Sequence, residues 1–423
     1  MDTNSVCPVC LAKLPAWLEK RGESYYLVKN CPSHGAFDTV VWRGDWWDYA
    51  PSRGDAPPDC PDGCGLCENH LNKTCCALVE VTSRCNLNCP VCFASSGGEA
   101  GKEPTVGELF EIFKRLCDKG STFVQLSGGE PTVRDDLPEI VAAARRAGCE
   151  TVQLNSNGLR LGREPEFTKR LADAGLSFVF MQFDGTRDAI YETLRGRPLL
   201  AEKRAAIDVC AENLLGVTLV PTVVPGVNDG DIGAILDFAF KKSPAVRGVH
   251  FQPISYFGRY PRAPRNEARI TLPEVLRAIE SQTGGKIKVT DFLPSSCDHP
   301  RCGFHGDFVV LPKGVILRLT PKYDPDAPCC APSGDAHLKN RSFVARRWTR
   351  TAQSGKQPGS NADFRDMGNF LARVKSHGFT VTAMAFQDAY TLDMDRLRRC
   401  SLHVFDGENT VPFCARYIFG GAR

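Results

Sequence analysis

The sequence predicts an α/β fold built on a partial (β/α)6 TIM-like barrel, with an N-terminal metal ribbon and a C-terminal auxiliary-cluster domain. Two observations lead to this prediction. Short apolar runs alternate with amphipathic helix patterns over residues 77–291, and the chain has 20 cysteines, most of them in short clusters. Repeated strand–helix units form parallel sheets, and in barrels of such units the chemistry gathers at the carboxyl ends of the strands.

The composition narrows the class of protein. A chain of 423 residues is too long for one compact core, and a net charge of +3 gives no field that would attract nucleic acid. The N-terminus has no basic segment followed by an apolar stretch, and no window approaches the roughly 18 apolar residues of a membrane span. We therefore expect a cytoplasmic protein. Its predicted regions are residues 1–50, 51–76, 77–291 and 292–423.

Residues 1–50 are predicted to form a zinc-ribbon or rubredoxin-like metal domain. The pairs Cys7-x2-Cys10 and Cys31-x2-His34 flank a strand-like run at residues 25–28. Two such pairs on facing turns suit a tetrahedral zinc or iron site. We expect a structural role, because all four ligands would come from the protein and none would stay open for chemistry.

Residues 51–76 are predicted to bind an auxiliary [4Fe–4S] cluster. Cys60, Cys64 and Cys67 are closely spaced, and Cys75 supplies a fourth thiolate. A second zinc site that uses His70 is the alternative. Cys75 is preferred to its neighbour as the ligand, because the next residue begins an apolar strand and suits a buried small side chain.

Six strand patterns and intervening helices make up residues 77–291. The helices include residues 106–119 and 137–147. The strands are predicted at residues 77–81, 122–126, 151–154, 178–183, 217–223 and 249–253. Every motif described below follows one of these strands, or lies close behind it in the chain, so the motifs are expected to meet at one edge of the sheet.

The first strand is followed by Cys85-x3-Cys89-x2-Cys92 and then by Phe93. Three thiolates bind three irons of a [4Fe–4S] cluster and leave the fourth iron open. This spacing in this place resembles the signature of the radical S-adenosylmethionine (SAM) superfamily, in which SAM chelates the open iron. The resemblance implies that Phe93 lies by the adenine and contributes through its backbone, and simple packing is the alternative.

Two further strand ends resemble motifs of the same superfamily. Ser127-Gly128-Gly129-Glu130-Pro131 resembles the GGE motif, whose glycines allow close approach of the methionine moiety and whose glutamate accepts from its ammonium group. Asn155-Ser156-Asn157-Gly158 resembles the ribose-contacting segment, where the short amides of Asn155 and Asn157 suit hydroxyl groups.

The later strands add candidates for cofactor binding. Gln182 and Asp184 are candidates to orient SAM or substrate, and Arg195 is a candidate partner for the SAM carboxylate, with a solvated helix-end arginine as the alternative. Residues 225–229 resemble the GVND turn of the superfamily, in which an apolar side chain, here Val227, meets adenine. Five motifs in order at successive strand ends favour a radical SAM enzyme.

Together with the ribbon and the segment from Cys64 to His70, this order of motifs resembles the tetraether synthase-like family. That resemblance implies several iron–sulfur clusters, one mononuclear metal, and coupling of unactivated carbons of lipid chains. It also implies a second auxiliary cluster in residues 292–423. The predicted ligands are Cys297, Cys302, Cys400 and Cys414, with Cys329 and Cys330 as competitors.

The sequence is also compatible with other functions. The competing enzymatic prediction is a radical SAM methyltransferase or another carbon–carbon bond-forming enzyme acting on a cofactor precursor. The non-enzymatic alternatives are an iron–sulfur electron carrier and a zinc-ribbon binding module. The expected partners are a small-molecule or lipid substrate and an electron donor such as ferredoxin or flavodoxin. A peripheral membrane contact is compatible with the sequence, and no nucleic acid is expected.

Overall fold

The structure is a computed structural model, and it describes residues 2–44, 70, 72–97, 102–260, 262–295, 297–321, 336–350, 364 and 366–420. The predicted ligands Cys60, Cys64 and Cys67 lie outside the described residues, as do Cys329 and Cys330. The cysteines in the described part are free thiols. No helix in that part is long and apolar enough to cross a lipid bilayer.

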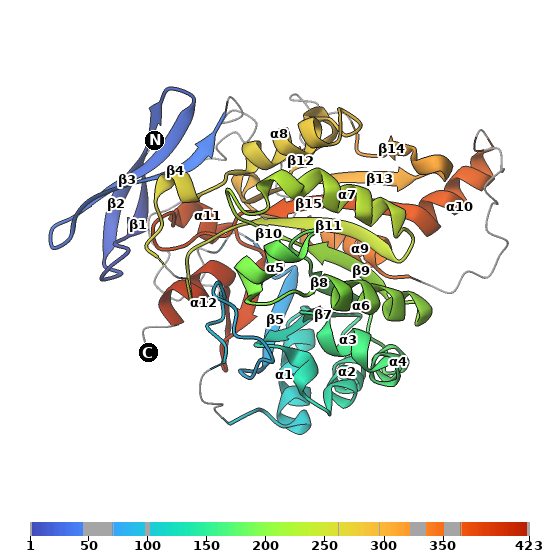
Figure 1. Cartoon of the computed structure of the whole chain (residues 1–423). Helices are drawn as coiled ribbons and strands as arrows, with labels where there is room; N and C mark the ends of the chain where they lie inside the picture. The colour runs from blue at the N-terminus through green and yellow to red at the C-terminus, as the bar shows by residue number, and fades with distance from the viewer. Residues whose placement is uncertain are drawn as a thin grey trace.

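The N-terminal ribbon is a four-stranded antiparallel sheet in the order β1-β2-β3-β4. Its strands are β1 (Asp2–Val6), β2 (Lys13–Arg21), β3 (Ser24–Cys31) and β4 (Gly35–Arg43). Side chains alternate between the two faces of β2, so one face points inward: Leu14 and Ala16 are buried, while Trp17 is exposed. Trp42 of β4 belongs to the main hydrophobic core, so the ribbon packs directly on the rest of the molecule. In Figure 1 it lies beside α11 (Met394–Arg398).

Six parallel strands stand side by side in chain order at the centre of the main sheet. They are β5 (Cys76–Thr82), β6 (Phe123–Gly128), β7 (Thr151–Ser156), β8 (Phe178–Gln182), β9 (Gly216–Val220) and β11 (Val246–Pro253). These correspond to the six predicted strands, with small differences at their ends. The pattern of apolar runs therefore located the strands correctly.

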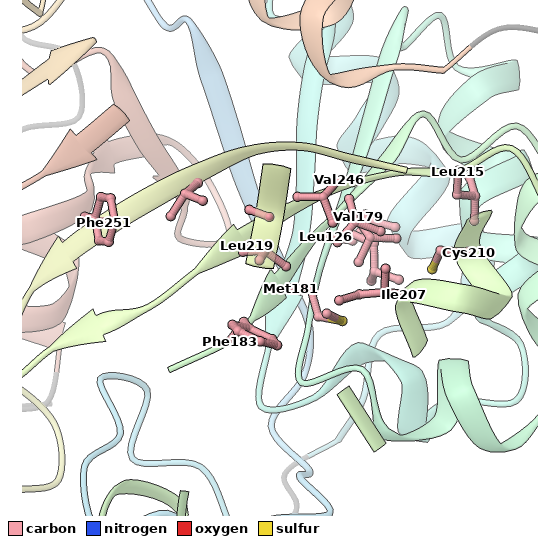
Figure 2. Packing of buried hydrophobic residues seen from close by; sticks show 14 of the residues in the cluster. Leu126, Val179, Met181, Phe183, Ile207, Cys210, Leu215, Leu219, Val246 and Phe251 are labelled. Atoms are coloured by element: carbon pink, nitrogen blue, oxygen red, sulfur yellow. The ribbon is translucent and has the colours of Figure 1, made fainter. Parts of the chain in front are cut away.

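The connecting helices cover one face of these strands. They are α1 (Val106–Asp118), α2 (Leu137–Arg146), α3 (Leu159–Arg163), α4 (Pro165–Asp173), α5 (Asp188–Arg195), α6 (Leu200–Glu212), α7 (Ile232–Lys241) and α8 (Leu272–Gln282). Figure 2 shows Val179 and Met181 of β8 close to Ile207 and Cys210 of α6 in the core. Alternate residues of the strands face the other way and line a cavity.

Residues after 292 extend the same sheet at both edges. On the β11 side, β15 (Gly378–Met384) is followed by β13 (Gly303–Val310) and β12 (Leu293–Pro294); on the β5 side, β16 (Leu402–Phe405) is followed by β17 (Thr410–Pro412). Two short strands pair outside this path, β10 (Thr222–Val223) with β11 and β14 (Ile316–Arg318) with β13. The fold is therefore mixed α/β. The C-terminal part shares the central sheet instead of forming a separate layer over it.

The remaining helices are α9 (Ala336–Trp348), α10 (Met367–His377) and α12 (Phe413–Phe419). The indole ring of Trp348, at the end of α9, lies 5.4 Å from the ring of Phe178 and 4.8 Å from that of Phe180, between ring centroids. Its Nε1 donates to Thr380 Oγ1 at 2.7 Å. Helix α9 thus packs against the face of the sheet that carries the cavity.

Candidate active site

Cys85, Cys89 and Cys92 lie in a loop that follows β5, and all three thiols line one cavity of about 310 Å³. The ends of β6, β7 and β8 line the same cavity through residues such as Ser127, Asn155 and Gln182. The cavity therefore includes the carboxyl ends of the parallel strands, where the sequence predicted the chemistry, and it extends along their inner face to Cys76 and Phe123.

Gly128 and Gly129 let the start of this loop approach β6 closely. A Cβ on Gly128 would lie 2.0 Å from the Thr82 carbonyl oxygen, and one on Gly129 would lie 2.1 Å from that of Arg84. Gly128 also has a φ of +127°, which disfavours other residues. The amides of Gly129 and Glu130 donate to the same two carbonyls, each at 2.8 Å. In the described structure these glycines make room for the chain that leads into Cys85, a role that the sequence did not suggest.

Arg259 fixes the other end of the loop and was not predicted. Its backbone pairs with Cys92 in both directions, at 2.8 and 2.9 Å. Its side chain donates to the Cys89 carbonyl at 2.8 Å and to the Ser96 carbonyl at 3.0 Å. No local pattern marks this arginine, because its partners lie more than 160 positions away in the chain.

The thiols have surroundings that suit an iron–sulfur cluster. The Leu87 amide lies 3.4 Å from Cys85 Sγ, and Ser96 Oγ lies 3.3 Å from Cys92 Sγ. Burial raises the pKa of Cys85 to about 11, so metal binding must displace its proton.

Glu130 joins the ends of β6 and β7. Its Oε1 accepts from Thr132 N, Thr132 Oγ1 and Ser156 Oγ at 3.1, 2.6 and 2.8 Å, and its Oε2 accepts from the Asn157 amide at 2.6 Å. Each carboxylate oxygen has about two lone-pair sites. Of the two Glu130 oxygens, only Oε2 can therefore still accept the hydrogen bond that was predicted from the ammonium group of SAM.

Asn157 continues this connection toward the cluster loop. Its Nδ2 donates to Asn86 Oδ1 at 2.7 Å. Its carbonyl accepts from Lys203 Nζ, and the same ammonium group lies 3.3 Å from Gln182 Oε1. Burial lowers the pKa of Lys203 to about 8. Lys203 was not among the predicted site residues, although its position on the apolar side of α6, three residues before Ala206 and four before Ile207, was a usable signal.

Arg195 lines the cavity and is held from behind by Asp184. Its Nε and Nη2 each lie 2.7 Å from an oxygen of the Asp184 carboxylate, which has no exposed surface. The Thr222 amide donates to Asp184 at 3.1 Å, and Asn228 Nδ2 donates to the Asp184 carbonyl at 2.8 Å. Burial alone would lower the pKa of Arg195. The charge of the Asp184 carboxylate and its hydrogen bonds have the larger effect, so the pKa of the guanidinium is raised.

The structure brings most predicted cofactor residues to the cavity wall. The lining includes Phe93, Gly128, Gly129, Glu130, Asn155, Asn157, Gln182 and Arg195. Asp184 and Val227 do not line it: the first is enclosed behind Arg195, and the second is half-buried in the turn after β10. Phe93 is 38% exposed and packs edge-on against Tyr417, with 5.0 Å between ring centroids.

The four predicted ribbon ligands converge. The ligand atoms of Cys7, Cys10, Cys31 and His34 all lie within 4.8 Å of one another. His34 Nδ1 is 3.6 Å from Cys7 Sγ and 3.5 Å from Cys31 Sγ, and Cys10 Sγ is 4.0 Å from Cys31 Sγ. A tetrahedral zinc site has ligand atoms about 3.5–3.8 Å apart. Burial raises the pKa of Cys7, but amides of Cys10 and Val9 outweigh it and bring the pKa to about 7, which favours the thiolate ligand.

The four predicted C-terminal cysteines divide into two groups. Cys302, Cys400 and Cys414 line one small cavity beside Arg396. Cys297 instead hydrogen-bonds to Cys75, which lowers the pKa of Cys75 and raises that of Cys297. The predicted set of four is therefore not brought together as one group. The reason is that Cys297 lies beside the start of β5, where Ser401 Oγ donates to its sulfur at 3.3 Å.

Cys117 and Cys149 form a pair of neighbouring thiols in the core that the sequence did not indicate. Their sulfurs lie 3.3 Å apart, because α1 and the loop before β7 meet at that point. The pair lies on the helix-covered side of the sheet and does not line the cavity.

Comparison with known families gives the class of this protein. Residues 79–239 match the radical SAM superfamily, and residues 1–43 match the HMPTM N-terminal zinc ribbon domain. The thiol triad at the first strand end, together with these matches, defines a radical SAM enzyme with an N-terminal zinc ribbon, which uses SAM bound to a [4Fe–4S] cluster. An electron carrier or a binding module without catalysis is not supported.

One relative matches over nearly the whole length. The chain is 32% identical to the 7,8-dihydro-6-hydroxymethylpterin dimethyltransferase of Methanocaldococcus jannaschii, over 97% of this chain and 92% of that one. It therefore belongs to the family of that enzyme. A shorter match, 29% identical over 47% of this chain and 62% of the relative, is to GTP 3′,8-cyclase of Nautilia profundicola.

Among solved structures, Streptococcus suis SuiB bound to S-adenosylmethionine is similar with a TM-score of 0.43 and 15% identity, over 51% of this chain and 48% of that one. The predicted resemblance to the radical SAM superfamily is confirmed. The narrower resemblance to the tetraether synthase-like family is not supported, because the whole-length relative is named for methyl transfer to a pterin.

Proposed function

We propose that this enzyme forms a carbon–carbon bond at an unactivated carbon of a reduced pterin, by methyl transfer. The observation that carries the proposal is the cavity, in which Cys85, Cys89 and Cys92 face the ends of the parallel strands. The name of the whole-length relative supports the pterin as the substrate class. We also infer that the six parallel strands form the partial barrel expected of the superfamily.

The predicted cofactor contacts are part of this proposal. Cys85, Cys89 and Cys92 would hold the cluster, and Asn155, Gln182 and Arg195 would contact SAM. A [4Fe–4S] cluster with SAM on its open iron supplies, after one-electron reduction, a 5′-deoxyadenosyl radical that removes a hydrogen atom from an unactivated carbon. Asp184 orients Arg195 from behind, and Glu130 and Lys203 keep the strand ends in register with the loop.

Auxiliary clusters would pass electrons or hold reactants near this cavity. We propose that Cys302, Cys400 and Cys414 hold one of them, because they share a cavity. Cys75 and Cys297 would belong to another site, together with ligands from residues 60–67. A ferredoxin or flavodoxin is the proposed electron donor, and a cytoplasmic location remains a prediction.

Lipid coupling is a second candidate because of one observation. Five apolar residues of the cavity lining, here called the apolar wall, pack in two clusters that share Leu402: they are Phe123, Val344, Phe386, Leu402 and Phe413. Such a surface suits a saturated hydrocarbon chain better than it suits a polar heterocycle. A lipid chain that lies along the apolar wall would place an unactivated carbon in the same cavity.

Hydrogen-transfer labelling separates these candidates. The anaerobically reconstituted enzyme is reduced with SAM and either deuterated 6-hydroxymethyl-7,8-dihydropterin or a deuterated dialkyl glycerol ether. Deuterium in 5′-deoxyadenosine with the pterin alone supports the proposal, and deuterium with the ether alone supports the lipid candidate. If no 5′-deoxyadenosine forms under any condition, the chain does not carry out radical SAM chemistry and both candidates fail.

A further inference from the structure

The same cavity is also bounded by Gln125, Gln153, His250 and Gln252, here called the amide wall. Gln125 of β6 pairs in register with Gln153 of β7, and His250 and Gln252 stand on β11. The interiors of barrels of this kind are usually filled by branched apolar side chains. Four uncharged polar side chains on one inner surface are therefore expected to form hydrogen bonds with a ligand.

Three members of the amide wall, Gln125, Gln153 and His250, keep hydrogen-bonding capacity for a ligand. Gln153 uses Nε2 to donate to Asn155 Oδ1 at 2.9 Å, which leaves its carbonyl oxygen. Gln125 has only a weak contact at Oε1, 3.7 Å from Cys76 Sγ. His250 uses Nδ1 for Thr382 Oγ1 at 2.8 Å, which leaves Nε2. A buried polar group without a partner destabilises the protein, so such capacity suits a site that binds its ligand by hydrogen bonds.

A second, independent observation comes from β9. Thr218 has no exposed surface, and its Oγ1 is without a hydrogen-bond partner in the described structure. By strand alternation Thr218 faces the same side as Val220, which lines the cavity, and Thr218 itself lies beneath that lining. A polar atom left unpaired at this depth is expected where a ligand or an ordered molecule completes the site.

The amide wall is uncharged, and aromatic rings stand beside it. Burial lowers the pKa of His250 to about 4, so its imidazole is neutral at physiological pH. The Phe180 ring lies 5.3 Å from that of His250 and 4.8 Å from that of Trp348, between centroids. A phosphate or carboxylate would find no cation on this wall. A neutral planar ring would find amides for its edge and aromatic rings beside it.

We infer that the amide wall binds the lactam edge of a neutral, pterin-like heterocycle, with Gln125 and Gln153 as donors and acceptors for its ring amide and His250 at the opposite side. Glutamine side chains recognise such donor–acceptor edges through paired hydrogen bonds. This inference rests on the proposed function, which it deepens by naming the residues that select the substrate. It also implies that a substrate with a charged head group does not bind there.

Equilibrium binding tests the inference without turnover. The full-length reconstituted enzyme with SAM is titrated with 6-hydroxymethyl-7,8-dihydropterin. We expect Gln153→Glu, which puts a charge on the amide wall, and His250→Phe, which removes the imidazole nitrogens, each to weaken binding about tenfold, as the loss of one buried hydrogen bond predicts. Asn213→Asp, the same amide-to-acid change outside the barrel, is the control. His250→Phe and Gln252→Leu keep the test usable if Gln153→Glu does not fold.

The outcomes separate this inference from the proposed function. If the wild type binds and methylates the pterin while all three variants bind it as tightly as the wild type does, the inference is wrong and the proposed function stands. If the wild type binds a dialkyl glycerol ether and no pterin, both the inference and the pterin substrate are wrong. Weakened pterin binding in the variants, with the control unchanged, supports the inference.

Discussion

Arg195 and Asp184 form a bidentate ion pair inside the protein, with both nitrogen–oxygen distances at 2.7 Å. Asp184 follows β8 and Arg195 ends α5, so the pair ties a strand end to its connecting helix. The carboxylate supplies the geometry and the charge balance that keep the guanidinium against the cavity. A cation in that place suits the carboxylate of SAM.

Asp184→Asn should destabilise the protein strongly. It leaves the buried guanidinium of Arg195 without its counter-charge, and breaking a buried pair in this way costs about 3–5 kcal/mol. Urea unfolding measures the free energy change. Asp173→Asn, which removes an exposed partner of Lys169, is the matched control and should change little. An equal effect of the two substitutions would show that the buried pair has no special role.

Gly129→Ala should disrupt the cluster loop. The added Cβ would meet the Arg84 carbonyl at 2.1 Å, so the chain leading into Cys85 must move. A displacement of about 1 Å at a reacting group costs a rate on the order of a hundredfold. Iron content and 5′-deoxyadenosine formation are the measurements. Gly107→Ala, where the nearest atom to the new Cβ lies at 3.9 Å, serves as control. A variant with full iron and normal SAM cleavage would contradict the role given to this glycine.

Lys203 should make stability rise with pH. Burial lowers its pKa to about 8 in the folded protein, below the value of about 10.4 of an unfolded chain. Between these two values the unfolded state binds more protons, so the contribution of this group to the free energy of unfolding increases with pH, by up to about 3 kcal/mol. Below about pH 8 Lys203 is protonated in both states, so the full destabilisation of the folded state by its buried charge is present.

The measurement for Lys203 is a comparison of variants. The difference in the free energy of unfolding between the wild type and Lys203→Met, determined by urea unfolding at pH 7 and pH 9.5, should shift in favour of the wild type at the higher pH. Lys119→Met, at an exposed lysine that ends α1, should show no such shift. A pH-independent difference for Lys203 would mean that its ammonium is not destabilised by burial.

Cys31→Ser should remove the ribbon metal and leave the radical chemistry intact. Cys31 is one of four protein ligands at a closed site, so the metal has a structural part and its binding energy contributes to folding of the ribbon. Elemental analysis should show one metal ion fewer per chain, with unchanged iron in the clusters. Loss of SAM cleavage in a folded variant that retains its clusters would instead assign the ribbon metal to catalysis.

The sequence predicted those features that depend on local pattern. The six parallel strands follow from apolar runs with polar strand ends, and the four ribbon ligands were recognisable because the two members of each pair are only three positions apart. Residues such as Asn155 and Gln182 were found for the same reason, since they end a strand that was already located.

Features that depend on distant chain segments were not predictable. Arg259 reaches back to Cys89, and Cys117 meets Cys149, only because the sheet brings these segments together. The role of Gly128 depends on the position of Thr82, which no spacing encodes. The pairing of β15 with β11 and of β16 with β5 is a further feature of this kind, because nothing in the sequence of these strands indicates their partners.

The two groups of C-terminal cysteines give a final prediction. If Cys302, Cys400 and Cys414 hold one cluster, each single serine substitution should remove the iron of that cluster. The double variant Cys302→Ser/Cys414→Ser should lose no more iron than either single variant, because the effects of residues that act as one unit are not additive. Cys302→Ser/Cys75→Ser should lose the iron of two clusters. Cys117→Ser is the control for the loss of a thiol outside these groups.

The substitution Cys297→Ser tests which cluster Cys297 belongs to: the one with Cys302, as the sequence predicts, or the one with Cys75, as its position in the structure indicates. Cys297 lies against Cys75, and its sulfur accepts from Ser401 Oγ at 3.3 Å, so its loss should have the same effect on iron content as Cys75→Ser. Combined with Cys302→Ser, it should then remove the iron of a second cluster. If the combination loses no more iron than Cys302→Ser alone, Cys297 shares a cluster with Cys302. The set of four predicted from the sequence would then be correct, and side chains in this region would have to rearrange when the cluster binds.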